Sequence, residues 1–315
     1  MTARQLIVLG TASQAPTRYR HHNGYALRWD DQLVLFDPGE GTQRQCIFGG
    51  VAVARLDAVC VTHFHGDHCL GLPGVIQRRA LDNRSADDAG GPEPAVLPVF
   101  YPADGQPYFD RLRAASIFHD TSRAEGHPIT EEGPVAELGT TGLRLSAAWL
   151  HHRVPTLGYR LDEPDARRLD PAELERRGLR GPEVGRLVRD GHLDTPSGRV
   201  ELAEVSHDRP GQSMAFVMDT RPGPGAERLA AGVDLLVCES TFLHRDVALA
   251  ERYGHMTALQ AATLARRAGA RRLVLTHFSA RYTDAREFEV EARTVHPDVV
   301  VAEDLAVIDV PPRAG

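Results

Sequence analysis

The chain has 315 residues, a formal net charge of −7, and hydrophobic and charged fractions of 42% and 25%, which are ordinary for a globular protein. All 36 basic residues are arginine, which excludes Schiff-base lysine chemistry and a lysine-containing phosphate-binding loop. Bound anions must therefore be held by guanidinium groups, backbone amides, histidine or metal. No apolar run approaches the ~18 residues of a membrane span, and the N-terminus does not resemble a signal peptide. The four cysteines lack a CxxC spacing, so we expect free thiols in a cytoplasmic protein that does not bind membranes.

Short apolar runs predict strands along the whole chain. The predicted strands are 5–9, 33–37, 56–61, 143–149, 214–218, 234–238, 272–276 and 298–302. Helical periodicity over 256–268 predicts a helix that starts near Thr257 and ends at Gly269. Residues 69–81 are also compatible with a helix. Many short strands with helices between them indicate a layered α/β protein.

Two segments look like insertions into this layered core. Residues 82–95 are rich in Asp, Gly and Pro and predict a loop or a partly mobile linker. Residues 162–200 are polar, punctuated by Pro and Gly, and show no periodicity that would build a core. We therefore predict a single domain over 1–315 that carries an inserted, flexible arm at 162–200.

The strongest chemical signal is THFHGDH at 62–68, which directly follows a predicted strand. A turn at the end of a strand can aim alternate side chains into one cavity. His63 and His65 can then reach one ion, while Asp67 and His68 reach a second. Imidazole and carboxylate without thiolate suit a hydrolytic Zn²⁺ site that keeps an open position. The motif therefore predicts a dinuclear metal centre.

Four ligands from one loop are too few for two ions, so further ligands should come from other strand ends. His151 or His152 follows one predicted strand, Asp219 follows another, and His277 follows a third. The carboxyl ends of strands are the recurring location of sites in layered α/β folds. These candidates complete a dinuclear centre, and position in the chain leaves the choice between His151 and His152 open.

Taken together, these motifs resemble the metallo-β-lactamase superfamily and, more narrowly, its ribonuclease Z family, endonucleases that trim the 3′ end of precursor tRNA. The resemblance extends over essentially the whole chain. Its pieces are LGTASQAPTRYR at 9–20, LFDPGEGTQRQ at 35–45, VTHFHGDHCLGLPG at 61–74, HRVPTLGYR at 152–160, GLRGPEVGRL at 178–187, FVMDTRP at 216–222, CESTF at 238–242, GHMTALQAA at 254–262 and LTHFSARY at 275–282.

The resemblance implies a metallo-β-lactamase-type αβ/βα sandwich with a protruding, substrate-binding arm. It also implies two Zn²⁺ ions per subunit and no organic cofactor. The implied ligands are His63, His65 and His152 for one zinc, Asp67, His68 and His277 for the other, and Asp219 as a bridge. His152 is preferred to His151 because the family histidine lies six residues before the glycine that corresponds to Gly158.

The same resemblance implies the catalytic roles and the reaction. Asp67 would orient the attacking hydroxide or take its proton. His255 would protonate the leaving 3′ oxygen, and Glu239 would orient His255. General acid catalysis of this kind is worth roughly 10²–10⁴-fold in rate. The expected activity is removal of the 3′ trailer from precursor tRNA by a homodimeric enzyme, which leaves a 3′-hydroxyl on the tRNA.

An acidic protein that binds RNA needs its arginines gathered locally, because contacts to phosphate dominate affinity. Residues 1–29 and 256–282 contain arginine but no Asp or Glu, and 176–189 contains five arginines against Glu183 alone. The segment 178–187 resembles the family's arm tip, where glycine lets the backbone approach phosphate. The predicted RNA contacts are Arg18, Arg20, Arg177, Arg180, Gly181, Pro182, Gly185, Arg186 and Arg281.

Two other functions compete with this prediction. A small-molecule hydrolase of the same superfamily, such as a phosphodiesterase or an arylsulfatase-like enzyme, would share the metal motif. Such an enzyme has no use for a projecting basic tip, so the arm at 162–200 discriminates against it. A non-enzymatic RNA-binding scaffold would require missing ligands, and none is missing from this sequence.

Overall fold

The computed structural model describes residues 4–88, 93–140 and 142–313. The chain divides into two compact units. The main unit comprises residues up to 162 together with 213–313, and the inserted unit comprises 163–212. The inserted unit therefore extends beyond residue 200, where the predicted arm ends.

The first sheet of the main unit has the strand order β18-β1-β2-β3-β4-β5-β6. Its strands are β1 (Arg4–Gly10), β2 (Gly24–Trp29), β3 (Gln32–Phe36), β4 (Ala58–Cys60), β5 (Leu97–Pro102), β6 (Ala124–Ile129) and β18 (Val307–Asp309). Pairing is antiparallel from β18 to β3 and parallel from β3 to β6. The central strands read as continuous apolar runs because both faces of this sheet are covered.

The second sheet has the strand order β17-β16-β15-β14-β9-β8-β7. Its strands are β7 (Gly133–Leu138), β8 (Leu143–Leu150), β9 (Thr156–Asp162), β14 (Ser213–Val217), β15 (Leu235–Glu239), β16 (Arg272–Thr276) and β17 (Val299–Val301). Strands β14 to β17 run parallel, so their carboxyl ends lie at one edge of the sheet. The pairs β14·β9, β9·β8 and β8·β7 are antiparallel.

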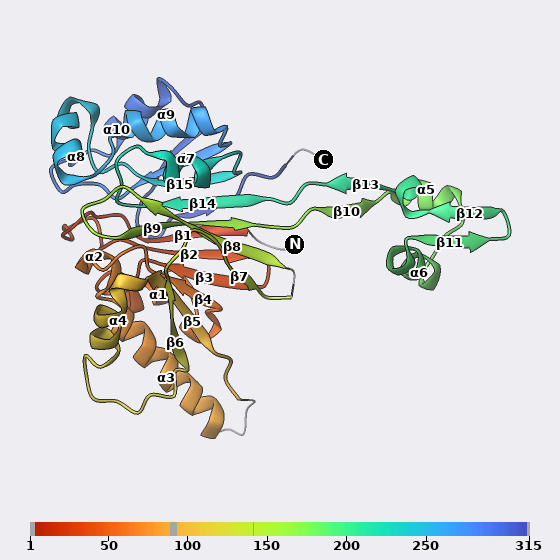
Figure 1. The fold of residues 1–315 in the computed structure, drawn as a ribbon, viewed down its shortest axis with the longest axis horizontal. Helices are drawn as coiled ribbons and strands as arrows, with labels where there is room; N and C mark the ends of the chain where they lie inside the picture. Colours follow the sequence, from red (N-terminus) through yellow and green to blue (C-terminus); the bar gives the residue numbers. More distant parts are fainter. Residues whose placement is uncertain (1–3, 89–92, 141, 314–315) are drawn as a thin grey trace. The chain divides into compact units, whose positions relative to one another are not determined.

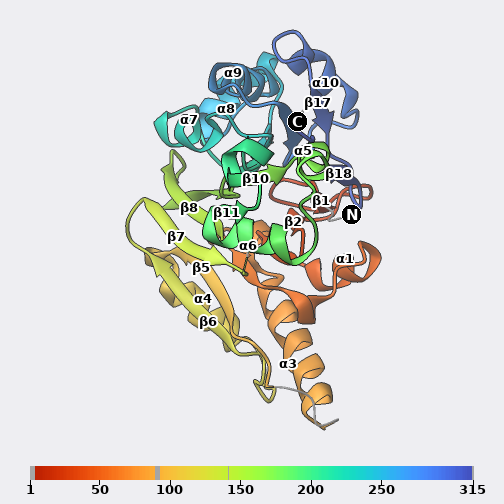
Figure 2. The ribbon, with the colours of Figure 1, turned by 90° about the vertical axis from the view of Figure 1, so that its right-hand side faces the viewer.

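The two sheets pack against each other around a buried cluster in which the rings of Phe36 and Phe216 stack 4.7 Å apart. Helices α1, α3 and α4 cover the first sheet, and α7, α8, α9 and α10 cover the second (Figures 1 and 2). The helices of this unit are α1 (Thr42–Phe48), α2 (Gly66–Cys69), α3 (Leu72–Asp88), α4 (Gln106–Arg113), α7 (Pro224–Ala230), α8 (Val247–Tyr253), α9 (Ala258–Ala268) and α10 (Arg286–Arg293). The predicted αβ/βα sandwich is confirmed.

The predicted helix at 256–268 forms as α9, and its ends follow from local chemistry. The Thr257 hydroxyl accepts a hydrogen bond from the Gln260 amide, and the Gln260 side chain accepts one from the Thr257 amide, which makes a capping box. Gly269 ends the helix with φ of 71°, a left-handed conformation that favours glycine.

The loop predicted over 82–95 is wrong for its first half, because α3 continues to Asp88. Side-chain contacts stabilise this polar end of the helix. The guanidinium of Arg78 pairs with Asp82 at 3.0 Å, and the Asn83 amide donates to the Thr121 carbonyl at 2.8 Å. The glycines and prolines that indicated a loop all follow Asp88 in the sequence, and residues 89–92 lie outside the described part of the chain.

The inserted unit has a small core of its own, so the prediction that this segment lacks core-forming periodicity is wrong. Its elements are β10 (Ala166–Leu169), α5 (Pro171–Arg176), α6 (Pro182–Asp190), β11 (His192–Thr195), β12 (Gly198–Glu201) and β13 (Ser206–Arg209). Strand β10 pairs with β13 and β11 with β12, both antiparallel. The buried cluster is Leu179, Leu187, Leu193, Val200 and Val205. Because α6 is amphipathic, it buries Leu187 while Arg186 and Arg189 stay exposed.

In the part of the chain that the structure describes, every helix is too short or too polar to traverse a lipid bilayer. The thiols of Cys46, Cys60, Cys69 and Cys238 are free and buried. Burial raises the pKa of the Cys46 and Cys69 thiols to about 12, so both are protonated and unreactive at neutral pH.

Replacement of Leu187 by alanine should destabilise the inserted unit and leave the main unit intact. The Leu187 side chain is fully buried, and such truncations cost about 2–5 kcal/mol, which is large for so small a core. Hydrogen-exchange mass spectrometry should show faster exchange over 163–212 alone. Val188→Ala, in which the truncated side chain is 51% exposed, is the matched control. Equal loss of protection in both units would contradict the division.

Candidate active site

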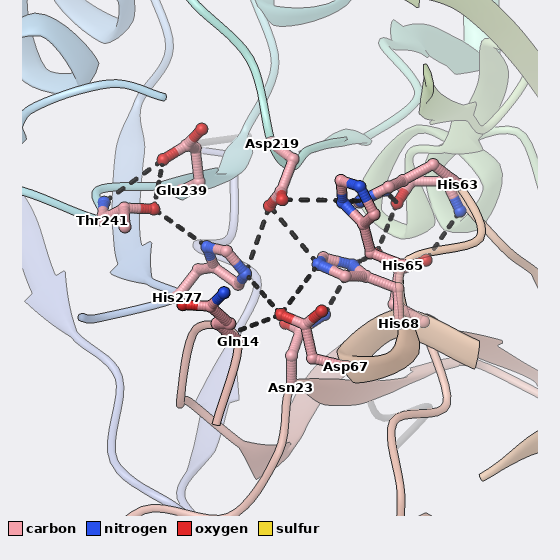
Figure 3. A network of polar contacts seen from close by, with 12 residues as sticks. Gln14, Asn23, His63, His65, Asp67, His68, Asp219, Glu239, Thr241 and His277 are labelled. Atoms are coloured by element: carbon pink, nitrogen blue, oxygen red, sulfur yellow. Dashed lines mark hydrogen bonds and ion pairs between the residues drawn. The ribbon is translucent and has the colours of Figure 1, made fainter. Parts of the chain in front are cut away.

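The side chains predicted to bind metal converge where strands of both sheets end (Figure 3). His63 follows β4 of the first sheet, and His152 follows β8 of the second. Asp219 and His277 follow the parallel strands β14 and β16. The strand ends therefore bring together ligand side chains that are separated by more than two hundred residues in the sequence.

The backbone is strained where two of these side chains enter the site. Asp219 and His277 have φ of 40° and 61°, in the left-handed region that residues other than glycine rarely adopt. Asp37, directly after β3, has φ of 44°. Such conformations cost about 1–3 kcal/mol each and persist where surrounding structure maintains them, commonly at functional sites. Here they turn Asp219 and His277 toward each other, 3.2 Å apart, and Asp37 toward His68.

The ligand atoms form two groups that meet at one carboxylate. The first group is His63, His65, His152 and Asp219, and the second is Asp67, His68 and His277. Asp219 Oδ2 lies 3.5 Å from His63 Nε2 and 3.6 Å from His152 Nε2. Its other oxygen, Oδ1, lies 3.4 Å from His68 Nε2 and 3.2 Å from His277 Nε2. Asp219 therefore faces both groups, one oxygen to each.

Unpaired polar atoms show that this arrangement fits a cation. Among the residues that the structure describes, His68 Nε2, His277 Nε2 and Asp219 Oδ1 are buried without a hydrogen-bond partner. Asp67 Oδ2 lies 3.4 Å from each of the two histidine nitrogens. Zinc bonds of ~2.0–2.1 Å in a tetrahedron separate ligand atoms by ~3.3 Å. The four atoms thus have the spacing that a metal requires.

His65 turns its Nδ1 toward the cluster, 2.8 Å from His63 Nε2, and each of the other four histidine ligands holds its outward-facing ring nitrogen by a hydrogen bond. The contacts are His63 Nδ1 to Thr62 Oγ1 (3.0 Å), His68 Nδ1 to Asp37 Oδ2 (2.7 Å), His152 Nδ1 to the Gly254 carbonyl (2.9 Å) and His277 Nδ1 to Thr241 Oγ1 (2.9 Å). Partners of this kind fix the ring orientation and leave Nε2 free to bind metal.

Electrostatics place most of these groups in the protonation states that bind metal. The exception is His68: burial would lower its pKa, but the charges of Asp219, Asp67 and Asp37 raise it well above the usual value, so a bound metal must displace a proton there. Burial alone would raise the pKa of the Asp219 carboxyl, but His277 and His68 more than offset burial and hold that pKa well below its usual value. Burial lowers the pKa of His63, His65 and His152, which leaves their rings neutral. Ionised carboxylates and neutral imidazoles are the forms that coordinate a cation.

A second pair lies beside the centre. His255 Nδ1 lies 3.0 Å from Glu239 Oε1, and the imidazole is close enough to Asp219 and His277 to share a ligand group with them. Burial would lower the pKa of His255, but the negative charges of Glu239 and Asp219 raise it to about 9. His255 is therefore protonated at neutral pH and can donate a proton into the site.

Several supporting residues were not found by sequence reasoning. Asp37 accepts hydrogen bonds from the amide and hydroxyl of Thr62 and contacts His68. The Thr241 hydroxyl bridges Glu239 Oε2 (2.6 Å) and His277 Nδ1 (2.9 Å), as Figure 3 shows. The only available signal was position, because both follow apolar strands and occur in the motifs LFDPGEGTQRQ and CESTF.

These groups open into a cavity of about 650 Å³ in the main unit. Asp67 lines it, and the Gln14 amide donates to Asp67 Oδ2 at 2.7 Å. Arg281, predicted to contact RNA, lies on the cavity wall and is exposed. Arg153 is also exposed on this wall, and the sequence analysis did not single it out.

The other residues predicted to contact RNA differ in exposure and in whether they are paired within the protein. Arg20 is half-buried, donates to the Tyr282 carbonyl at 2.9 Å and stacks over Phe278. In the inserted unit, Arg177 is paired with Glu173 and Glu204. Within the described residues, the remaining predicted arginines are exposed and form no ion pair. They are Arg18, Arg180, Arg186 and Arg281. Arg186 acts on Asp190 only at longer range, where its charge adds to that of Arg189 in lowering the pKa of the carboxyl. Gly181, Pro182 and Gly185 are also exposed, in and before α6.

Acid-free stretches of sequence are not acid-free in space. Arg4 pairs with Asp30, Arg271 with Asp234, and Arg272 with Asp298. These arginines stabilise the fold through contacts made within the main unit. The argument from local arginine content therefore does not apply to them.

Replacement of His152 by alanine should release bound metal, whereas replacement of His151 should not. His152 Nε2 points into the first ligand group, while His151 is exposed and absent from both groups. The metal content of the purified variants, measured by mass spectrometry, shows which of the two adjacent histidines is the ligand. Equal metal content in both variants would contradict the geometric assignment.

Comparisons with known proteins agree with this geometry. Residues 18–198 match the family model described as metallo-beta-lactamase superfamily, and 189–278 match the beta-lactamase superfamily domain. The chain is 52% identical to ribonuclease Z of Salinispora arenicola, over 99% of this chain and 98% of that protein. It is 46% identical to ribonuclease Z of Chlamydia pneumoniae, over 96% and 95% of the two chains. The crystal structure of the short form of human tRNase Z superposes with a TM-score of 0.70, at 23% identity, over 98% of this chain and 100% of that one. The chain belongs to the ribonuclease Z family of the metallo-β-lactamase superfamily.

Proposed function

We propose that this protein is a metal-dependent endoribonuclease that removes the 3′ trailer from precursor tRNA and leaves a 3′-hydroxyl on the tRNA. The observation that carries the proposal is that one cavity contains both a set of cation ligands and a proton donor. Asp219 joins two groups of cation ligands, and the protonated His255 lies beside them. The same cavity could thus neutralise the negative charge of a phosphodiester and protonate its leaving oxygen.

The proposed cofactor is two Zn²⁺ ions per subunit, with no organic cofactor. His63, His65 and His152 would hold one ion, Asp67, His68 and His277 the other, and Asp219 would bridge them. Imidazole and carboxylate ligands without thiolate support zinc at a hydrolytic site. When bound, such ions acidify water and stabilise the oxygens of an in-line displacement.

The side chains of this cavity would then divide the proton transfers between them. Asp67, oriented by the Gln14 amide, would accept or steer the proton of the attacking water. As hydroxide joins the phosphorus, the bond to the 3′ oxygen breaks, and His255 would donate its proton to that oxygen. Glu239, fully buried, holds His255 in place through Nδ1 and favours its protonated form.

Incubation with a precursor tRNA that carries a 3′ trailer tests the proposal. The wild-type enzyme should cut at the junction between tRNA and trailer. His255→Ala should keep its metal and lose roughly 10²–10⁴-fold in turnover, because the leaving oxygen is no longer protonated. The loss should be much smaller for bis(p-nitrophenyl) phosphate, whose leaving group needs no proton. Absence of cleavage at the junction would refute the proposed function, and loss of metal in the variant would refute the role of His255.

The inserted unit is the proposed tRNA-holding arm of a metallo-β-lactamase-like domain. Its support is the separate core of residues 163–212, together with Arg180 and Arg186, which are exposed. We also propose a homodimer, on the basis of resemblance to the family. The free, buried thiols support a reducing compartment such as the cytoplasm.

Substitution of both Arg180 and Arg186 by alanine should weaken binding of precursor tRNA. The magnitude of the slope of log affinity against log salt concentration should fall by about 2, because two phosphate contacts are lost. Filter binding at several salt concentrations measures both effects. Arg167→Ala is the matched control, because Arg167 lies in the same unit but pairs with Asp208. An equal effect of the control would show that only net charge matters.

A further inference from the structure

Tyr253 lies beside the proton donor without a part in the chemistry described above. It ends α8, its side chain is 40% exposed, and it lines the active-site cavity. Gly254 follows with φ of 82°, and this left-handed turn brings His255 into the same cavity. One turn of chain therefore presents an exposed aromatic ring next to the group that would protonate the leaving oxygen.

This turn is held firmly against the metal-ligand cluster. The amides of Gly254 and His255 both donate to the Ala250 carbonyl at 2.9 Å. The Gly254 carbonyl accepts from His152 Nδ1 at 2.9 Å, and a Cβ added at Gly254 would lie only 3.0 Å from that nitrogen. The position of Tyr253 is thus fixed relative to the first ligand group.

The Tyr253 ring has an aromatic support and a nearby cation. Phe242, which is buried, lies nearly parallel to it, with an angle of 13° and centroids 6.4 Å apart. Phe242 also contacts the His255 ring, 6.1 Å away. The guanidinium carbon of Arg252 lies 5.6 Å from the Tyr253 centroid, and Arg252 is exposed with no acidic partner among the described residues.

These features suit the binding of a nucleobase. Bases stack on exposed aromatic rings regardless of their sequence, and arginine adds a cation–π contribution. Of the described residues that line the cavity, Phe242 and Tyr253 alone carry benzene rings, and only Tyr253 is exposed. A base that enters this cavity therefore finds one aromatic platform.

The chemistry decides which base this is. Hydrolysis places the hydroxide on phosphorus, the phosphate stays with the trailer, and the proton of His255 goes to the departing 3′ oxygen. That oxygen belongs to the last nucleotide of the tRNA, not to the trailer. Groups adjacent to His255 consequently face the nucleotide on the 5′ side of the scissile bond.

We infer that Tyr253, supported by Phe242, stacks on the base of the nucleotide whose 3′ oxygen leaves. This inference rests on the proposed function. Stacking there places the ribose of that nucleotide, and hence its 3′ oxygen, within reach of His255. Tyr253 is thus a substrate-positioning residue on the tRNA side of the cut.

The test compares three substrates with wild-type enzyme, Tyr253→Leu and Tyr253→Phe. The substrates are precursor tRNA, the same RNA with an abasic site at the last nucleotide of the tRNA, and one with an abasic site at the first trailer nucleotide. Single-turnover kcat/KM is measured, and metal content confirms an intact site. Tyr253→Leu should lower kcat/KM on precursor tRNA by about 5- to 150-fold, which corresponds to the loss of one base–aromatic stack.

Three results would support the inference together. Tyr253→Phe should recover most of the activity, because the ring remains. The difference between wild type and Tyr253→Leu should vanish with the abasic site on the tRNA side and persist with the abasic site in the trailer. Phe48→Leu should behave as wild type, since Phe48 is an exposed ring under an arginine on α1, away from the cavity.

The contrary outcomes are distinct. If Tyr253→Leu still lowers kcat/KM on the substrate with the abasic site on the tRNA side, the inference is overturned. It is also overturned if only the abasic site in the trailer removes the difference between wild type and Tyr253→Leu. Equal defects in the leucine and phenylalanine variants would assign the effect to the hydroxyl instead. If wild-type enzyme cuts none of the substrates, the proposed function itself fails. Cleavage by wild type without an effect of Tyr253→Leu overturns this inference alone.

Discussion

The rest of the structure depends on the buried carboxylate of Asp219 facing two groups of histidines at once. Buried polar groups without partners destabilise a fold, and here His68, His277 and Asp219 all present unpaired atoms to one point. The backbone strain at Asp219 and His277 adds to this cost. A bound cation would satisfy these atoms, so metal binding and stability of the site are expected to be coupled. Both sheets contribute to this site, because the ligand side chains follow the ends of their strands.

The ligand cluster and the acid pair form one hydrogen-bonded network. Thr241 contacts His277 with the same hydroxyl that donates to Glu239, and Glu239 in turn holds His255. The turn after α8 makes a second connection, since the Gly254 carbonyl orients His152 while the next residue is His255. Shared contacts therefore set the positions of the proton donor and of two metal ligands, although the His255 side chain itself holds neither ligand. The same turn carries Tyr253, which links placement of the substrate to placement of the acid.

Charge pairing explains how an acidic chain can keep a few arginines for RNA. Arg4, Arg271 and Arg272 neutralise carboxylates that are distant in sequence, and their role is structural. The arginines left exposed without a carboxylate partner among the described residues include Arg281 at the cavity and Arg180 in the inserted unit. What matters for a polyanion is therefore the partner that each arginine finds in the fold, rather than the density of arginine along the chain.

The sequence by itself determined the layered α/β class, eight of the strands and the strand ends that carry His63, Asp219 and His277, because apolar runs and motif spacing are local properties. It missed β2, β5, β6, β7, β9 and β18 of the main unit. It misjudged the end of α3 and the core of the inserted unit, since side-chain contacts such as Asn83 to Thr121 and the burial of Leu187 arise only on folding. Tertiary structure placed His152, which the family resemblance had favoured, among the ligand atoms and left its neighbour His151 exposed. It alone revealed Asp37, Thr241 and Tyr253, because a residue that acts through its neighbours is recognised only when those neighbours are in place.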